Sequence, residues 1–315
     1  MSGPLASVII CAHNAGSLLS DALESIRRQT YSNLEILVVD DGSTDGAADA
    51  LRDTIDDGRV RWLRQEQAGK AAALNHALQH ASGEFYGIQD ADDLSHPRRI
   101  ELQAAALAEA PDLAAVFCGH ELIIGRRRLA PRFSGKDRVA CRRDIDAFRM
   151  PAHDPTVMYR RTLVADIEYE PALRIGQGFD HILRVGERHP MIVLGECLYS
   201  YRVARRSNTT RSVELREEMV REVMRRACRR RGLPLPDTTR LPRGRNRRSD
   251  NNLAAHFMES ALDQARNGRR VEAIRTGFQC VALHPVDPHY YKALAYATLP
   301  MPLVKRMRRT VGADS

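Results

Sequence analysis

Short β-rich segments alternate with amphipathic segments between Ser7 and Ala110, and this order constrains the fold more than any other feature of the chain. Apolar residues recur at helical spacing between the β-rich segments, as expected of a parallel sheet covered by helices. The sequence therefore predicts an α/β domain. The predicted strands are Ser7–Cys11, Glu35–Asp40, Val60–Leu63 and Phe85–Gln89.

Two acidic clusters lie where two of these predicted strands end. Asp40 is the last residue of the second predicted strand, and Asp41 follows it directly. The segment Asp90-Ala91-Asp92-Asp93 follows the fourth predicted strand. In an open α/β sheet, the loops at the carboxyl ends of the strands form the ligand crevice. We therefore expect both clusters to line a ligand site.

The cluster from Asp90 to Asp93 places several carboxylates on one short turn, before a helix predicted to begin near Pro97. Such carboxylates repel one another unless a cation lies between them, and oxygen ligands suit Mg²⁺ or Mn²⁺ bridged to substrate phosphates. The metal would neutralise charge on a departing diphosphate. The alternative is a solvated turn whose acids lie near a helix start, where the helix dipole favours them.

The cluster at Asp40 also has two interpretations. Gly42 permits a tight turn, and a residue from Ser43 to Asp45 can cap the following helix, so a capping loop is one of them. However, Asp40 ends an apolar strand, so we expect its carboxylate to be partly buried and to need a hydrogen-bond donor. The ring N–H and ribose hydroxyls of a nucleotide would supply one.

Four segments together resemble the family 2 glycosyltransferases of bacterial type, which have the GT-A fold. The resemblance covers about residues 5–204 and implies a Rossmann-like mixed sheet with flanking helices. It also implies transfer of a sugar from a nucleoside-diphosphate sugar, usually a UDP-sugar and usually with inversion. The four segments are Ser7–Asn14, Val38–Asp45, Gly69–Asn75 and Asp90–Asp93.

The resemblance also implies roles for single residues. Asp40 would pair with the nucleotide base, usually uracil, and Asp92 would lie near both the ribose and the metal. The metal ligands would be Asp92 and Asp93. The full set of implied donor-binding residues is Ala12, Asn14, Asp40, Gly69, Lys70 and Asp92.

Inversion requires one base that deprotonates the acceptor hydroxyl as it attacks the anomeric carbon. Family members commonly carry Glu-Asp-Tyr-Asp here, the first Asp being the base, but the aligned residues of this chain place Gly178 at that position. The nearest carboxylate is Asp180, which we predict as the catalytic base. A capping or structural role for Asp180 is the alternative, and His153 and His181 are weaker candidates.

The sequence predicts three parts: a GT-A domain over residues 1–204, an Arg-rich helix and linker over 205–248, and a helical extension over 249–315 that resembles one tetratricopeptide-type hairpin. Residues 205–248 hold fifteen Arg against five acids. The segment could lie on anionic lipid, bind nucleic acid or an acidic polysaccharide, or form a soluble charged helix. Aromatic residues make up 5% of the chain and are sparse near these arginines, which argues against nucleic acid.

The remaining sequence features indicate where in the cell the protein is expected. No window approaches the roughly 18 apolar residues of a membrane-spanning helix, and the N-terminal residues do not resemble a signal peptide. We therefore expect a cytoplasmic protein. If the basic segment lies on anionic lipid, peripheral contact at the inner face of the membrane through Arg205–Arg248 and the C-terminus would follow. The six cysteines are far apart, so we expect free thiols, most of them buried.

Neither GxGxxG nor GxxxxGK[ST] follows the first predicted strand, which disfavours dinucleotide dehydrogenases and P-loop enzymes. The sequence predicts a glycosyltransferase, dependent on Mg²⁺ or Mn²⁺, that acts in polysaccharide biosynthesis on a glycan or lipid-linked acceptor. The alternative is a non-catalytic nucleotide-sugar-binding partner in a glycan assembly complex, which Gly178 and the hairpin-like tail favour.

Overall fold

The computed structural model describes residues 3–124, 127–129, 134–203 and 213–234 and, nearer the C-terminus, 257–258, 261–262, 264–265, 269–283, 290–291, 294–295 and 298. The chain divides into two compact units. The first comprises residues 1–123, 133–202 and 214–241, and the second comprises 124–132, 203–213 and 242–315. All residues of the predicted site belong to the first unit.

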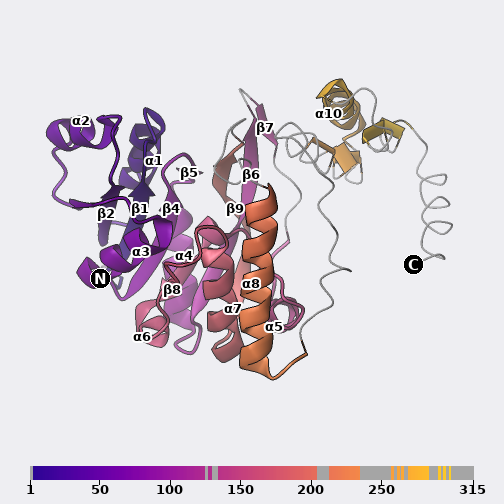
Figure 1. Cartoon of the computed structure of the whole chain (residues 1–315). Coiled ribbons are helices and arrows are strands. Elements are labelled where there is room, and N and C mark those ends of the chain that lie inside the picture. Colours follow the sequence, from indigo (N-terminus) through magenta and orange to yellow (C-terminus); the bar gives the residue numbers. More distant parts are fainter. Residues whose placement is uncertain are drawn as a thin grey trace. The chain divides into compact units, whose positions relative to one another are not determined.

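The first unit is built on a mixed sheet with the strand order β3-β2-β1-β4-β8-β6-β9-β5 (Figure 1). The run from β3 to β4 is parallel, β8 is antiparallel to both of its neighbours, and β5 is antiparallel to β9. The predicted α/β class with a mixed sheet is therefore confirmed. The strands are β1 (Ala6–Ala12), β2 (Leu34–Asp41), β3 (Val60–Gln65), β4 (Phe85–Asp90), β5 (Leu94–Ser95), β6 (Ala115–Ile124), β8 (Met158–Arg160) and β9 (Met191–Arg202).

Helices cover both faces of the sheet because successive side chains of each central strand point to opposite faces. In β1, Val8 and Ile10 pack with one set of helices, whereas Ile9 packs with the other. On the first face lie α1 (Leu18–Arg27), α2 (Ala47–Thr54) and α4 (Arg99–Glu109). On the second face lie α3 (Lys70–His80), α5 (Arg138–Asp146), the short α6 (Arg161–Val164), α7 (Gln177–Arg188) and α8 (Val213–Arg231).

Each of the first four predicted strands matches an observed one to within two residues. The second half of the domain was harder to predict. The sequence indicated strands at Leu113–Cys118 and Ile192–Leu194, but β9 continues to Arg202. The short strand β8 and the 3₁₀ turn η1 (Asp154–Thr156) were not predicted. The sequence indicated a helix from Asp180 to His189, but helix α7 begins three residues earlier, at Gln177, after Gly176 in a left-handed conformation.

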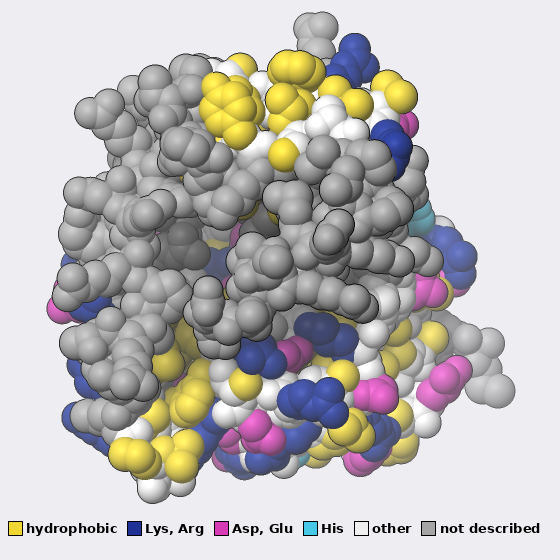
Figure 2. Space-filling model, turned by 90° about the vertical axis from the view of Figure 1, so that its right-hand side faces the viewer, with side chains coloured by type: hydrophobic (Ala, Val, Ile, Leu, Met, Phe, Trp, Pro, Cys, Tyr) yellow, Lys and Arg dark blue, Asp and Glu magenta, His cyan; other side chains and the backbone are white. Residues whose placement is uncertain are grey.

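Helix α8 packs against the sheet-bearing unit, and its arginines form ion pairs there. Val223 and Ala227 are buried in the core. Arg226 pairs with Glu170 at 2.6 Å, and Arg230 pairs with Glu187 at 2.9 Å. On the face shown in Figure 2, Lys and Arg side chains lie beside Asp and Glu side chains. These two arginines of α8 are therefore engaged by carboxylates of the same unit.

The remaining expectations concern the membrane, the thiols and the C-terminal part. Among the helices of the described residues, none combines the length and apolar character needed to cross a membrane. All six cysteines are free and four are buried, as expected. In the second unit, α10 (Arg270–Leu283) corresponds to part of the predicted helical extension, whereas the predicted linker after residue 234 lies outside the described residues.

Candidate active site

The register of the parallel strands brings the two acidic clusters together. Ala12, the last residue of β1, pairs with Asp40 of β2, and Cys11 pairs with Asp90 of β4. Because β1 lies between β2 and β4, the two clusters flank its carboxyl end. The two clusters therefore lie at the same edge of the sheet, and their role as a ligand site stays a prediction.

Asp41 ties the end of β2 to the loop before α3. Its carboxylate accepts hydrogen bonds from the backbone N–H groups of Ala68 at 2.8 Å and Gly69 at 2.9 Å, and from Gln65 Nε2 at 2.8 Å. Gly69 has φ +92°, a conformation that glycine adopts without strain, and it immediately precedes α3. Asp41 thereby positions the Gly69–Lys70 segment.

Asp40 is buried, as expected, but its partners come from the protein itself. The backbone N–H of Ser43 donates to its Oδ1 at 2.9 Å, and Arg64 lies 3.6 Å from Oδ2. The neighbouring turn fits a glycine at position 42, because a Cβ there would lie 2.7 Å from the backbone nitrogen of Gln67. The capping-loop interpretation therefore describes part of this cluster.

Asn14 links the loop after β1 to the loop after β2. It has φ +51°, its Oδ1 accepts from the backbone N–H of Thr44 at 2.8 Å, and its own N–H donates to Ser43 Oγ at 3.0 Å. Ala12, two residues earlier, is buried. The implied nucleotide-binding positions Ala12, Asn14 and Asp40 thus lie near the carboxyl ends of the adjacent strands β1 and β2.

Lys70 connects the loop before α3 to the acidic turn. Its Nζ lies 2.5 Å from Asp90 Oδ1. Burial lowers the pKa of Lys70, but the charges of Asp90 and Asp154 raise it by more, so the net pKa lies above its ordinary value. The ammonium group is therefore a fixed positive charge beside the acidic turn.

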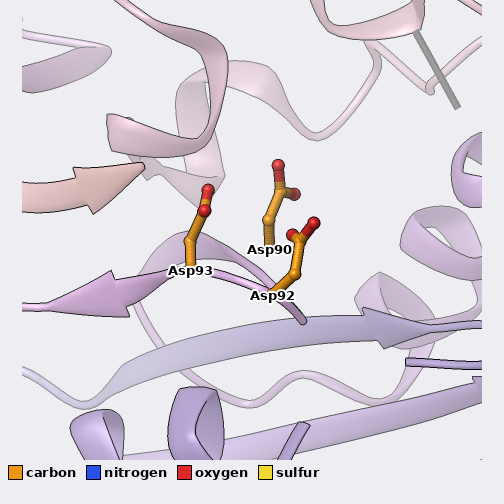
Figure 3. A group of neighbouring side chains, drawn as sticks. All are labelled: Asp90, Asp92 and Asp93. Atoms are coloured by element: carbon orange, nitrogen blue, oxygen red, sulfur yellow. The ribbon is translucent and has the colours of Figure 1, made fainter. Parts of the chain in front are cut away.

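The acidic turn carries three carboxylates on one side of the chain, as Figure 3 shows for Asp90, Asp92 and Asp93. One oxygen from each lies within 4.8 Å of the others. Asp93 is fully buried; its Oδ2 accepts from Tyr199 Oη at 2.8 Å, and its Oδ1 accepts from the backbone N–H of Arg202 at 2.7 Å. Burial raises the pKa of Asp92 and Asp93, and neighbouring carboxylates raise it further.

This arrangement fits a divalent cation. The donors are hard carboxylate oxygens, which suit Mg²⁺ or Mn²⁺. Each carboxylate oxygen has two lone pairs, so the hydrogen bonds to Asp93 leave capacity for a metal and orient the group. The residues that would hold the ion are the predicted Asp92 and Asp93, together with Asp90, which the sequence placed in the cluster but not among the ligands.

The predicted base, Asp180, lies in the first turn of α7 with 2% of its surface exposed. Arg184 Nε donates to its Oδ2 at 2.8 Å, and Arg230 Nη1 donates to its Oδ1 at 3.4 Å. Both oxygens are thus engaged by arginines. The arrangement favours the structural alternative for Asp180.

The two histidine candidates lie in different environments. His181 is fully buried; its Nε2 donates to the carbonyl of Ile167 at 2.9 Å, and its ring stacks on Tyr169 at 4.0 Å. His153 lies among aromatic rings, 4.9 Å from both His120 and Tyr201. His181 is therefore part of the core.

Sequence reasoning did not find Tyr199 or Asp154 as site residues. Tyr199 lies in β9, more than a hundred residues from the acidic turn that it contacts, and nothing local in the sequence marks that contact. Asp154 lies in η1, a turn too short for a periodic signal. The Asp-Pro pair at its start favours a turn, which is the one local cue.

Comparisons with known proteins identify the family of the chain. The sequence matches the family described as Glycosyl transferase family 2 over residues 7–167, just over half of the chain. The chain therefore belongs to glycosyl transferase family 2.

Among curated relatives, it is 44% identical over 101 residues to the glycosyltransferase GlyG of Streptococcus pneumoniae, covering 31% of this chain and 33% of GlyG. It is 36% identical over 123 residues to an uncharacterized glycosyltransferase of Haemophilus influenzae, covering 38% of each. The matches span 18–39% of the curated relatives' lengths.

Solved structures share the fold. S. aureus TarS 1-349 in complex with UDP aligns with a TM-score of 0.57 at 20% identity, covering 93% of this chain and 88% of TarS. The mannosyltransferase PcManGT from Pyrobaculum calidifontis, in complex with GDP-Man and Mn²⁺, aligns with a TM-score of 0.57 at 23% identity, covering 94% and 85%. The mixed sheet with flanking helices is thus the GT-A fold.

Proposed function

We propose that the protein is a metal-dependent glycosyltransferase that transfers a sugar, with inversion, from a nucleoside-diphosphate sugar to an acceptor hydroxyl. The carrying observation is the acidic turn: Asp90, Asp92 and Asp93 present three convergent carboxylates at the carboxyl end of β4 in a family 2 chain. The structural neighbours named above contain UDP, or GDP-Man with Mn²⁺, which supports this donor class.

Different residues are proposed to bind different parts of the donor. Ala12, Asn14 and Asp40 lie where the nucleotide would bind, and Asp40 is proposed to pair with the base, preferably uracil. Gly69 and Lys70 approach the diphosphate from α3, whose first N–H groups and Lys70 charge favour an anion. Asp92 is proposed to lie near the ribose and, with Asp93, to bind Mg²⁺ or Mn²⁺, which would stabilise charge on the departing diphosphate.

The acceptor is proposed to be a glycan or a lipid-linked saccharide in polysaccharide biosynthesis. We further propose a cytoplasmic protein that contacts the inner face of the membrane through Arg205–Arg248 and the C-terminus. Sedimentation with anionic vesicles, compared with neutral ones, tests the membrane contact. Equal binding to both, or binding to neither, would argue against it.

Calorimetry tests the donor site. UDP should bind more tightly with Mn²⁺ or Mg²⁺ than with EDTA, and Asp92→Asn and Asp93→Asn should abolish the difference. Asp56→Asn, an exposed acid between α2 and β3, is the matched control and should bind as the wild type does. Unchanged affinity in both site variants would refute the assignment. Tight binding without donor hydrolysis for any common nucleotide sugar would favour the non-catalytic partner.

A further inference from the structure

The proposed transfer requires a carboxylate or another base that can take the proton of the acceptor hydroxyl, and most acids around the site are already engaged. Asp41 accepts three hydrogen bonds. Asp90 pairs with Lys70, and both oxygens of Asp180 are held by arginines. We propose that Asp154 is the general base of the reaction. This inference rests on the proposed function.

Asp154 extends its carboxylate into the space beside Gly178, in the first turn of α7. A Cβ built on Gly178 would lie 2.1 Å from Asp154 Oδ2, 2.2 Å from Cγ and 2.3 Å from Oδ1. A side chain at position 178 and the carboxylate of Asp154 therefore exclude each other. The glycine leaves room for a carboxylate that arrives from η1 instead of from α7.

The carboxylate of Asp154 has an unused acceptor. Its Oδ1 is shielded from solvent and has no hydrogen-bond partner among the residues that the structure describes. A buried polar atom without a partner costs free energy. Asp180, by contrast, is satisfied on both oxygens. Of the two, Asp154 is the carboxylate able to accept a hydrogen bond from an incoming hydroxyl.

Asp154 interacts electrostatically with two charged residues of the proposed donor site. Burial raises its pKa, the charge of Lys70 lowers it, that of Asp90 raises it, and the net pKa lies above the ordinary value. Lys70 and Asp90 are the ion pair at the edge of the acidic turn. A carboxylate with a raised pKa is also a better proton acceptor in the transition state.

The turn that carries Asp154 is held firmly by α4. Arg99 Nη2 donates to the carbonyl of Pro155 at 2.8 Å, and Gln103 Nε2 donates to the carbonyl of Thr156 at 2.8 Å. Both α4 side chains are fully buried. Arg99 and Gln103 are thus positioning residues, and they fix the backbone on which the base is mounted.

In the proposed step, the acceptor O–H bond breaks and its proton moves to the carboxylate of Asp154. The electron pair left on the acceptor oxygen forms the new bond to the anomeric carbon. The bond from that carbon to the diphosphate breaks, and its electron pair leaves with the diphosphate. Asp154 then releases the proton to solvent. Water can replace the acceptor, so donor hydrolysis reports on the same base.

Asp154→Asn tests the assignment in the full-length protein. We expect UDP–Mn²⁺ affinity to stay within twofold of the wild type while donor hydrolysis falls by about 100-fold or more, the range of general-base catalysis. The double variant Asp154→Ala with Gly178→Asp moves the carboxylate onto α7 and should recover at least about tenfold of that loss. Asp166→Asn, an exposed acid paired with Arg188, is the control.

Hydrolysis by Asp154→Asn within threefold of the wild type would overturn the assignment. So would an Asp180→Asn variant that binds UDP–Mn²⁺ normally and loses as much hydrolysis as Asp154→Asn. Thermal unfolding gives a readout independent of turnover. Because a buried, unpaired charge is removed, the Tm of Asp154→Asn should be unchanged or raised, and a decrease beyond about 4 °C would indicate a structural role instead.

The results that would refute the proposed function differ from those that would refute only the assignment of the base. If the wild type neither binds a nucleoside diphosphate nor hydrolyses any nucleotide sugar, the transferase assignment is wrong, and so is the assignment of Asp154 as the general base. If the wild type hydrolyses a donor and Asp154→Asn does so equally well, only the base is wrong.

Discussion

The phenol of Tyr199 holds the buried carboxylate of Asp93. Its Oη donates to Asp93 Oδ2 at 2.8 Å and accepts from the backbone N–H of Asp90 at 3.2 Å. One side chain of β9 therefore contacts both ends of the acidic turn. Groups that orient a metal ligand in this way commonly affect metal affinity by tenfold or more.

Replacing Tyr199 with Phe should weaken Mn²⁺-dependent UDP binding by on the order of tenfold, because Asp93 loses the donor that orients it. Binding measured with EDTA should change little. Tyr31→Phe is the control, since Tyr31 Oη donates to the carbonyl of Pro4 before β1. Equal metal dependence in Tyr199→Phe and the wild type, measured by calorimetry, would contradict this role.

Substitutions of the neighbouring acids Asp40 and Asp41 should affect different properties, namely nucleotide preference for Asp40 and folding stability for Asp41. Asp41→Asn replaces an acceptor of three hydrogen bonds with a group that also carries N–H donors, so the free energy of unfolding should fall by about 2 kcal/mol. Asp40→Asn should cost less stability and should reduce the preference for UDP over other nucleoside diphosphates. Urea unfolding and competitive calorimetry measure the two effects, and a reversed pattern would exchange the proposed roles.

Protonation of His181 should make stability depend on pH. Burial, and to a lesser extent the charge of Arg184, lower the pKa of His181 to about 3, although the hydrogen bond to the carbonyl of Ile167 raises it. The unfolded chain binds this proton near pH 6.5, whereas the folded chain does not, so stability falls as the pH falls from 6.5. Between pH 7.5 and 5.0 the loss from this residue should be about 2 kcal/mol.

Urea unfolding at the two pH values tests this prediction. His181→Asn should be less stable at pH 7.5, because the ring stacks on Tyr169 and fills the core. Its stability should nevertheless change less between the two pH values than that of the wild type. His80→Asn, at an exposed position at the end of α3, should retain the full wild-type pH dependence. The same slope in all three proteins would be incompatible with a buried neutral His181.

Arg99 should be the most sensitive residue of α4. Its guanidinium is fully buried and donates to the carbonyls of Ile88 at 2.9 Å and Pro155 at 2.8 Å. Arg99→Lys keeps the charge but loses the planar array of donors. We expect a loss of about 3 kcal/mol in unfolding free energy and slower donor hydrolysis. Arg98→Lys, whose side chain reaches only Glu101 on the surface, should be neutral.

The first half of the fold could be predicted because its strands and helices are regular. Apolar runs in β1 and β2 and helical spacing in α1 and α3 are local signals, and the acids follow directly at the strand ends. The juxtaposition of Asp40 and Asp90 follows from strand order, which the motif resemblance supplied together with the GT-A fold. Local pattern and fold family together predicted the acidic edge of the sheet.

The elements β8 and η1 could not be predicted in the same way. Strand β8 has three residues and η1 is a single turn, so neither carries a periodic pattern. The predicted base was chosen by proximity along the sequence to Gly178, which led to Asp180. The structure instead brings Asp154 to Gly178 across 24 positions, and the contact depends on how η1 packs against α7.

A side chain at position 178 would occupy the same space as the carboxylate of Asp154, so substitutions at these two positions should depend on each other. A carboxylate introduced at position 178 collides with Asp154, and a chain that loses Asp154 first keeps an empty place beside α7. Chimeras with other family members should therefore have their crossovers outside residues 154–178, so that both positions come from one parent. Chains with this arrangement can be searched for by two features together: the sequence Asp-Pro-Thr, and a glycine 24 residues after its Asp.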